Sequence, residues 1–209
     1  MNNYQRFFTN RPTTEIAKDL LGYQVLYDGP AGLIGGLIVE TEAYLGEQDS
    51  ASHAYGGRRT NYTESLYGNP GDIYIYQIRS HYCFDVVVQN VEEPQGILIR
   101  AIEPTINVER MSRNRGKHGV DVTNGPGKLV QALGIHDRQL DGQSMTNAPL
   151  TISLKTKRQP IKVASGPRVG INPYGANANE QLRFWVADNP YVSKMRKRDA
   201  DLENYGWRN

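Results

Sequence analysis

The stretch GLIGGLIVETEAYL (residues 32–45) predicts a long and largely apolar β-strand that nevertheless carries two acidic side chains, Glu40 and Glu42. Successive side chains point to opposite faces of a strand, so Glu40, Glu42 and Tyr44 share one face. Two carboxylates and a phenol therefore lie together on one side of this strand, and other parts of the chain must supply what surrounds them.

Strands also dominate the rest of the chain. The segments DIYIYQI (72–78) and YCFDVVVQ (82–89) are the clearest, and Arg79, Ser80 and His81 join them as a hairpin with a polar, cationic tip. Further strands are predicted over 23–28, 96–104, 150–155, 161–171 and 182–187, with Pro104 ending the second of these.

A few short helices lie among these strands. Residues 12–22 have apolar side chains at helical spacing, with Thr13 as a cap, and residues 106–117 read as a helix that frays into a basic loop. A third helix, 125–134, has Pro126 near its start and a glycine at its end. Many strands with few interspersed helices indicate the α+β class with a mostly antiparallel sheet.

Length and composition narrow the class of protein. A chain of 209 residues with 38% hydrophobic content can bury one core, which favours a single domain. Lys and Arg number 24 against 22 Asp and Glu, so the net charge of +2 permits nucleic-acid binding without arguing strongly for it. The one cysteine, Cys83, excludes an internal disulfide framework and a cysteine-based metal cluster, and it fits a reducing compartment.

Targeting signals are also missing from the sequence. No segment approaches the ~18 apolar residues needed to span a bilayer, and the N-terminus lacks the pattern of a signal peptide. We therefore expect a cytoplasmic protein with no membrane partner. Residues 46–71 (GEQDSASHAYGGRRTNYTESLYGNPG) show little periodicity, and a loop this long inside a compact domain is usually functional or disordered.

Three interpretations of Glu40 and Glu42 stay open on the residues alone. The pair could be a solvated acidic face with no further role, because charged side chains are rarely buried. With His53 nearby, it could hold a hard divalent cation, although the further Asp or Asn ligands that such ions prefer are missing. A carboxylate held against an aromatic ring in a partly dry cleft could instead act as a general base on water, as in glycosidic bond cleavage.

Aromatic and basic side chains add to this picture. Tyr74 and Tyr76 alternate with isoleucines, so both rings share one strand face and either pack across strands or line a cleft. Arg100 lies in an apolar segment, where a guanidinium needs a carboxylate or a phosphate as its partner. Four basic runs, GGRRTNYT, MSRNRGKHG, KTKR and SKMRKR, are interleaved with tyrosines, and together they favour contact with a phosphate backbone.

The order of the motifs resembles that of a known enzyme family. The segments IVETEAYLG, DSASHAYGGRRT, PGDIYIY, LIRAIEP, TNGPGKLVQALGI, GPRVGI and LRFWV follow one another as in the alkyladenine (3-methylpurine) DNA glycosylases, from about residue 7 to residue 193. Several motifs in a fixed order are far more specific than any one of them. The resemblance implies a single domain with a curved sheet and a protruding hairpin, with residues 194–209 as a C-terminal extension.

The resemblance also implies an activity and roles for particular residues. Members of this family flip a damaged purine out of double-stranded DNA and hydrolyse its N-glycosidic bond without a metal or another cofactor. Glu42 resembles the general base that deprotonates the water attacking C1′, and Arg100 resembles the arginine that contacts the target phosphate near that base. Tyr44 and His53 on one side and Tyr76 on the other resemble the walls between which the flipped base stacks.

The implied chemistry is consistent with these residues. Alkylation of a ring nitrogen makes a purine cationic, which weakens its glycosidic bond and strengthens its stacking on electron-rich rings. One carboxylate and one water then suffice, and a cationic leaving group needs no second acid. Arg58 and Arg59, together with Arg79 and His81, are expected to contact the DNA backbone or to intercalate.

Two positions depart from the family pattern. Relatives present a tyrosine at the hairpin tip that fills the gap left in the duplex, whereas this chain offers Arg79 and His81. Asp85 stands where relatives place an asparagine, and because an ionised aspartate cannot donate a hydrogen bond, the preference among adenine, hypoxanthine and guanine lesions is expected to differ. Glu40 has no role implied by the resemblance, and we expect it to be paired or solvated.

The sequence therefore predicts a monomeric, monofunctional DNA glycosylase for alkylated or deaminated purines, of the 3-methyladenine type and with hypoxanthine as a further substrate, in base excision repair. The alternative is a protein that binds distorted or damaged DNA through the same loops and tyrosines without cleaving it. A metal-dependent nuclease is a third hypothesis. The expected location is the cytoplasm, at the nucleoid in a prokaryotic cell.

Overall fold

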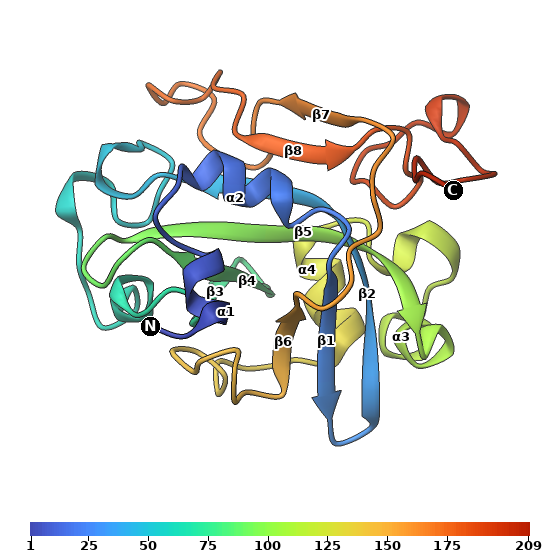
Figure 1. Ribbon diagram of the computed structural model, residues 1–209, viewed down its shortest axis with the longest axis horizontal. Coiled ribbons are helices and arrows are strands. Elements are labelled where there is room, and N and C mark those ends of the chain that lie inside the picture. The colour runs from blue at the N-terminus through green and yellow to red at the C-terminus, as the bar shows by residue number, and fades with distance from the viewer.

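Strand β2 (Gly32–Tyr44) lies in the middle of the sheet and organises it. In the computed structural model, which describes residues 1–209, eight strands form one sheet in which every pairing is antiparallel (Figure 1). One edge of β2 pairs with β5 (Gln95–Ile106), and the other edge pairs first with β1 (Gln24–Gly29) and then with β8 (Arg183–Val186). The remaining strands are β3 (Ile73–Ile78) and β4 (His81–Val88) beyond β5, β6 (Leu150–Ser153) beyond β1, and β7 (Val163–Gly166) beyond β8.

The sheet is curved because β2 is irregular along its length. Its pairing with β5 shifts register between Gly35 and Gly36 and again on both sides of Glu40, and such bulges bend a strand. A Cβ at Gly36 would lie 2.1 Å from the carbonyl oxygen of Glu103, so only glycine permits this close approach. Pro104 also pairs with Gly36, where a missing N–H is tolerated, so the prediction that it ends its strand is wrong. β1 and β6 run across the direction of β5 in Figure 1, and the predicted curved, mostly antiparallel α+β fold is confirmed.

Short helices pack on this sheet. α2 (Thr13–Asp19) contacts β2 and β5, and α4 (Pro126–Leu133) contacts β4, β5 and α3 (Val108–Arg115). The prediction that Thr13 caps α2 is wrong, because the N-cap is Pro12 and the Thr13 hydroxyl donates to Gln95 Oε1 at 2.6 Å instead. The helices are α1 (Asn3–Phe7), which was not predicted, α2 (Thr13–Asp19), α3 (Val108–Arg115) and α4 (Pro126–Leu133). None of them has the length and apolar character needed to cross a membrane.

The C-terminal residues 194–209, expected as an extension, return to the core. Trp207 is fully buried, and its indole Nε1–H donates to Glu103 Oε2 at 2.7 Å. A buried indole finds a hydrogen-bond partner because an unpaired N–H there would be costly. This segment therefore contributes to the same core as the sheet.

Residues 46–71 and the β3–β4 hairpin differ in their structure. Residues 46–71 are held by three short 3₁₀ turns, Gly46–Gln48, Tyr55–Gly57 and Glu64–Tyr67. The predicted β3–β4 hairpin is present, with Ile78 paired to His81 and a turn in which Arg79 adopts a positive φ of 56°. His81 is thus the first residue of β4 rather than part of the turn.

Candidate active site

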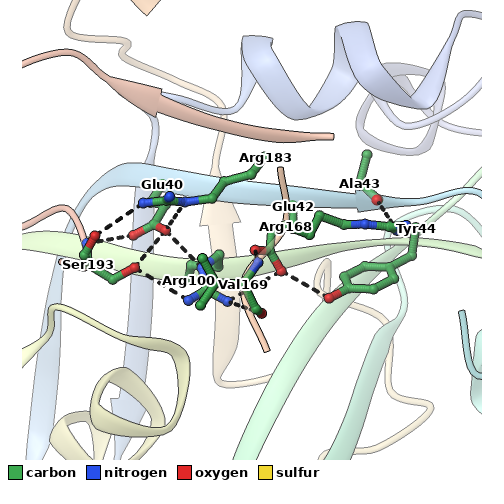
Figure 2. Close-up of polar contacts among 9 residues, drawn as sticks. All are labelled: Glu40, Glu42, Ala43, Tyr44, Arg100, Arg168, Val169, Arg183 and Ser193. Carbon is green, nitrogen blue, oxygen red and sulfur yellow. Dashed lines mark hydrogen bonds and ion pairs between the residues drawn. The ribbon is translucent and has the colours of Figure 1, made fainter. Parts of the chain in front are cut away.

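Glu40 and Glu42 are both fully buried, so the interpretation of a solvated acidic face is wrong. Arg100, which projects from β5, lies between them, as Figure 2 shows. Its Nε is 2.8 Å from Glu40 Oε1, and its Nη1 is 3.3 Å from Glu42 Oε2. The sequence allowed either a carboxylate or a phosphate as the partner of this guanidinium. The fold supplies carboxylates, from Glu40 and Glu42.

Glu40 is saturated with hydrogen bonds. Besides Arg100, it accepts from Arg183 Nε at 2.7 Å and from the backbone N–H and hydroxyl of Ser193 at 2.7 and 2.8 Å (Figure 2). Of the two states expected for Glu40, paired or solvated, the structure shows the paired one. Because Arg100 and Arg183 project from strands and Ser193 also donates its backbone N–H, Glu40 anchors the guanidinium of Arg100 in place.

Glu42 is held differently, by groups that border an open space. Its Oε1 accepts from the backbone N–H of Val169 at 2.7 Å, and its Oε2 accepts from the hydroxyl of Tyr44 at 2.9 Å (Figure 2). Burial raises the pKa of Glu42 above the ordinary value of a glutamate, while Arg100 and these two hydrogen bonds limit the rise and Glu40 adds to it. Tyr44, Arg100 and Val169 also line cavities, so they form the layer that separates the carboxylate from those cavities.

The donor set around the carboxylates suits a guanidinium rather than a metal ion. Arg100 occupies the place between Glu40 and Glu42, and His53 is hydrogen-bonded elsewhere, to Tyr74. Nowhere in the chain do three or more His, Cys, Asp or Glu side chains converge as a metal site requires. The hypothesis of a divalent cation between these residues therefore finds no matching ligand set.

The structure has an aromatic cavity of about 280 Å³, close to the ~300 Å³ lower end of small-molecule pockets. Tyr44 closes one side of it, and its hydroxyl is the group that reaches Glu42. Tyr74 and Tyr76 are stacked on each other, with ring centroids 5.1 Å apart, and they line the cavity together with Asp85. The structure thus brings together Tyr44, His53, Tyr74, Tyr76 and Asp85, all of which the sequence had singled out.

His53 lies on the same side of the cavity as the stacked tyrosines. Its Nδ1 is 2.7 Å from the hydroxyl of Tyr74, and its ring meets Tyr76 edge-on, with centroids 4.8 Å apart. Because these two rings are in edge contact, a base cannot stack between them. In this arrangement His53 and Tyr76 are therefore not opposite walls of a slot. Tyr44 is the other aromatic side chain of the predicted walls that lines this cavity. Desolvation at the cavity, with repulsion from Arg58, lowers the pKa of His53 below the ordinary value of a histidine.

Arg168 is a site residue that the pattern analysis missed. Its guanidinium lies 4.7 Å from the ring centroid of Tyr44, donates to the carbonyl of Ala43 at 2.9 Å and pairs with Asp49 at 2.7 Å. It therefore holds Tyr44 from behind, and the next residue, Val169, supplies the N–H that binds Glu42. The only sequence signal for Arg168 and Val169 was the motif GPRVGI, because residues in a loop do not belong to a periodic hydrophobic pattern.

A second cavity, of about 570 Å³, adjoins the first and is cationic. Tyr44, Tyr76 and Ile78 line both cavities. The second one also reaches the first turn of α4, whose unpaired backbone N–H groups carry partial positive charge. The cationic side chains along it are Arg79, Arg100, Arg115 and Lys128.

The residues expected to contact DNA fall into different environments. Arg79 is exposed at the hairpin tip, and His81, although also exposed, lies against the start of α4, where a Cβ at Gly127 would come within 2.8 Å of His81 Cβ. Arg58 is exposed and makes no ion pair, while Arg59 is engaged by Glu64 and Glu92. Those ion pairs make Arg59 a poorer candidate for a phosphate contact than Arg58.

Ile78 is an unpredicted feature of the hairpin. Its side chain is 48% exposed, although it borders both cavities. Exposed apolar side chains beside a cationic groove are the type that wedges between base steps. Ile78 thus joins Arg79 as a candidate to enter a duplex.

Comparisons with known proteins give a consistent result. The family model described as methylpurine-DNA glycosylase (MPG) matches residues 7–190. A protein of Latilactobacillus sakei is 56% identical over 202 residues, covering 96% of this chain and 95% of its own length, and one of Lactobacillus helveticus is 48% identical, covering 98% and 99%. One of Staphylococcus saprophyticus is 43% identical, covering 96% and 98%. Each of the three is named "Putative 3-methyladenine DNA glycosylase".

Proposed function

The chain belongs to the methylpurine-DNA glycosylase family, and on that premise we propose that it excises alkylated purines, of the 3-methyladenine type, from double-stranded DNA by flipping the nucleotide and hydrolysing its N-glycosidic bond. The observation that carries this proposal is the contact between Glu42 and Tyr44. It couples a buried carboxylate of raised pKa to the wall of an aromatic cavity.

The proposed reaction uses one water and one carboxylate. The flipped base lies in the gap between Tyr44 and Tyr76, where electron-rich rings favour a cation. Glu42 takes a proton from water as the water oxygen bonds to C1′ of the sugar. The C1′–nitrogen bond breaks, its electron pair neutralises the cationic purine, and the products are the free base and an abasic site. Glu42 then returns its proton to solvent.

The attacking water needs a route to Glu42, which has no exposed surface. The Arg100 Nη1 contact, at 3.3 Å, is the longest of the three polar contacts to this carboxylate, and Arg100 lines the cationic cavity. We propose that water enters beside Arg100, which Glu40 holds in place. Arg100 then acts by positioning the carboxylate and by limiting the rise of its pKa.

The cationic cavity provides a place for the DNA strand that carries the flipped nucleotide. Phosphates favour cationic side chains and helix N-termini, and both line this cavity. Ile78 and Arg79 at the hairpin tip are placed to fill the space from which the nucleotide leaves. Extrusion costs a few kcal/mol and is easiest for damaged bases that pair weakly, which adds selectivity, with deaminated purines such as hypoxanthine as further substrates.

Base release in the presence of EDTA tests the proposed activity against its rivals. Duplex DNA containing 3-methyladenine is incubated with the protein, and free base and strand breaks are measured separately. We expect free 3-methyladenine to appear with the strands intact. A protein that only binds distorted DNA would retain the duplex and release no base, and a metal-dependent nuclease would be silenced by the chelator.

The pH dependence of excision should show the raised pKa of Glu42. A general base works only when deprotonated, so the rate falls as the pH drops through its pKa. Because burial raises that pKa, we expect the acid limb of the single-turnover rate to lie above the pH range of an ordinary glutamate. A rate that stays flat down to pH 4 would contradict Glu42 as the base.

The hairpin tip should matter for duplex DNA and not for single strands. Filling a gap in stacked bases by a side chain is worth roughly 1–3 kcal/mol, so Arg79→Ala and Ile78→Ala should each weaken binding to a lesion duplex by about tenfold. Binding to the same lesion in single-stranded DNA should be unchanged, because no gap forms there. Arg6→Ala, which removes an exposed arginine on α1, is the matched control for loss of charge. Equal losses in Arg79→Ala and Arg6→Ala would assign the effect of Arg79 to charge alone, and no loss in Ile78→Ala would contradict Ile78 as a wedge.

A further inference from the structure

Asp85 is a buried acid that the proposed reaction does not use. It lies in the middle of β4, paired with Tyr74 on β3 and with Leu98 on β5. Only 4% of its surface is exposed, and it lines the aromatic cavity. Its Oδ1 is buried and has no hydrogen-bond partner. Such an atom is costly in a folded protein and calls for an explanation.

The surroundings of Asp85 contain no cation to balance its charge. The titratable groups around it are Glu42, Tyr44, Tyr74, Tyr76 and Cys83, all of which are neutral or negative. His53, which lines the same cavity, has a lowered pKa, which favours its neutral form. An ionised Asp85 would therefore be an uncompensated negative charge at the wall of the cavity.

The missing cation is supplied by the kind of base that the cavity is proposed to take. A purine alkylated at a ring nitrogen carries a positive charge, whereas hypoxanthine and the normal purines are neutral. Charge pairs inside a protein are far stronger than in water. Resting on the proposed function, we propose that Asp85 is a specificity-determining residue whose carboxylate pairs with the positive charge of the flipped base and so favours cationic over neutral lesions.

Asp85 pairs with a cationic base only when its carboxyl group is ionised, so the preference for cationic over neutral bases depends on pH. Burial raises the pKa of Asp85 to about 8, Glu42 adds to the rise, and the hydroxyl of Tyr76 opposes it. Below that pH the carboxyl group is neutral, so a cationic base must expel a proton to solvent before the pair forms. Binding of a cation is therefore favoured as the pH rises toward the pKa, and insertion of a neutral base is not.

The test compares a cationic with a neutral lesion in the same sequence context. The ratio of kcat/KM for 3-methyladenine to that for hypoxanthine cancels the contribution of Glu42, because both substrates share it. In the unaltered protein this ratio should rise by up to about tenfold per pH unit between pH 6 and 8 and then level off. In Asp85→Asn the ratio should fall by about 10- to 100-fold at pH 8 and lose its pH dependence.

A control variant and an equilibrium-binding measurement complete the test of Asp85. Glu93→Gln removes one exposed negative charge from the β4–β5 turn and should leave the ratio unchanged. Equilibrium binding of both duplexes in a Glu42→Gln background, with and without Asp85→Asn, gives the same comparison without turnover. A wild-type ratio that does not change with pH, or an unchanged preference in folded Asp85→Asn, would overturn the role of Asp85. Failure of the unaltered protein to release any base would instead overturn the proposed function.

Discussion

Glu42→Gln should abolish base excision while leaving the affinity for lesion-containing DNA within a few-fold of the unaltered protein. The amide has the size and shape of the carboxylate, and its oxygen can still accept from Val169 or Tyr44. It cannot take a proton from water, and loss of a positioned general base costs about 10²- to 10⁴-fold in rate.

Single-turnover release of 3-methyladenine, with binding measured in parallel, checks this expectation. Glu93→Gln is the control, because it makes the same chemical change at an exposed position outside both cavities. Thermal unfolding of both variants shows whether the fold is retained. Excision by folded Glu42→Gln at a rate comparable to that of the control would refute the assigned role.

Arg100→Met should destabilise the fold strongly, by about 3–5 kcal/mol, because it leaves two buried carboxylates without their shared cation. Methionine fills much of the same space, so the loss of stability measures the effect of removing the positive charge rather than the effect of a cavity. The destabilisation should be greatest at neutral and higher pH and smaller in acid, because without Arg100 a carboxyl group is more easily protonated and a neutral one needs no cation.

The free energy of unfolding in urea measures this effect. Arg59→Met is the matched control, because Arg59 also bridges two carboxylates but does so at the surface, where such pairs are worth about 0–1 kcal/mol. Adding Glu40→Gln to Arg100→Met should recover part of the loss, since one uncompensated charge is removed. A change below 1 kcal/mol for Arg100→Met would contradict a structural role for the buried cluster.

Local pattern was sufficient for the parts of the fold that depend on nearest neighbours. The period of a strand placed Glu40, Glu42 and Tyr44 on one face, and the β3–β4 hairpin and three of the four α-helices follow from similar signals. The errors arose where tertiary contacts decided the outcome. Thr13 bonds Gln95 instead of capping α2, and a bulge lets β5 continue.

The environment of the carboxylates could not be read from local pattern. Glu40 is bonded to Ser193, 153 residues away, and Arg168 to Asp49, 119 residues away. Such pairings depend on how the sheet curls and on where the loops return, which no period in the sequence encodes. Paired acidic residues on a strand read as solvated for that reason, although the fold buries both of them, Glu40 between Arg100 and Arg183 and Glu42 beside Arg100.

The choice of candidate site residues came from the order of motifs rather than from their chemistry taken singly. The structure then separates those candidates by environment: Tyr44, Tyr76 and Asp85 line one cavity, His81 packs on α4, and Arg59 is tied up in surface ion pairs. Sequence order can name such residues, but their side-chain partners decide which of them are free to meet a substrate.

The central claim is that a purine turned out of the duplex lies between Tyr44 and Tyr76 with its sugar beside Glu42. The most direct test is a crystal structure of Glu42→Gln bound to duplex DNA that contains 3-deaza-3-methyladenine, whose glycosidic bond resists hydrolysis. We expect the modified base in the aromatic cavity, C1′ facing residue 42 and the hairpin tip in the vacated stack. A base that stays stacked in the helix, or one bound elsewhere on the protein, would contradict the account.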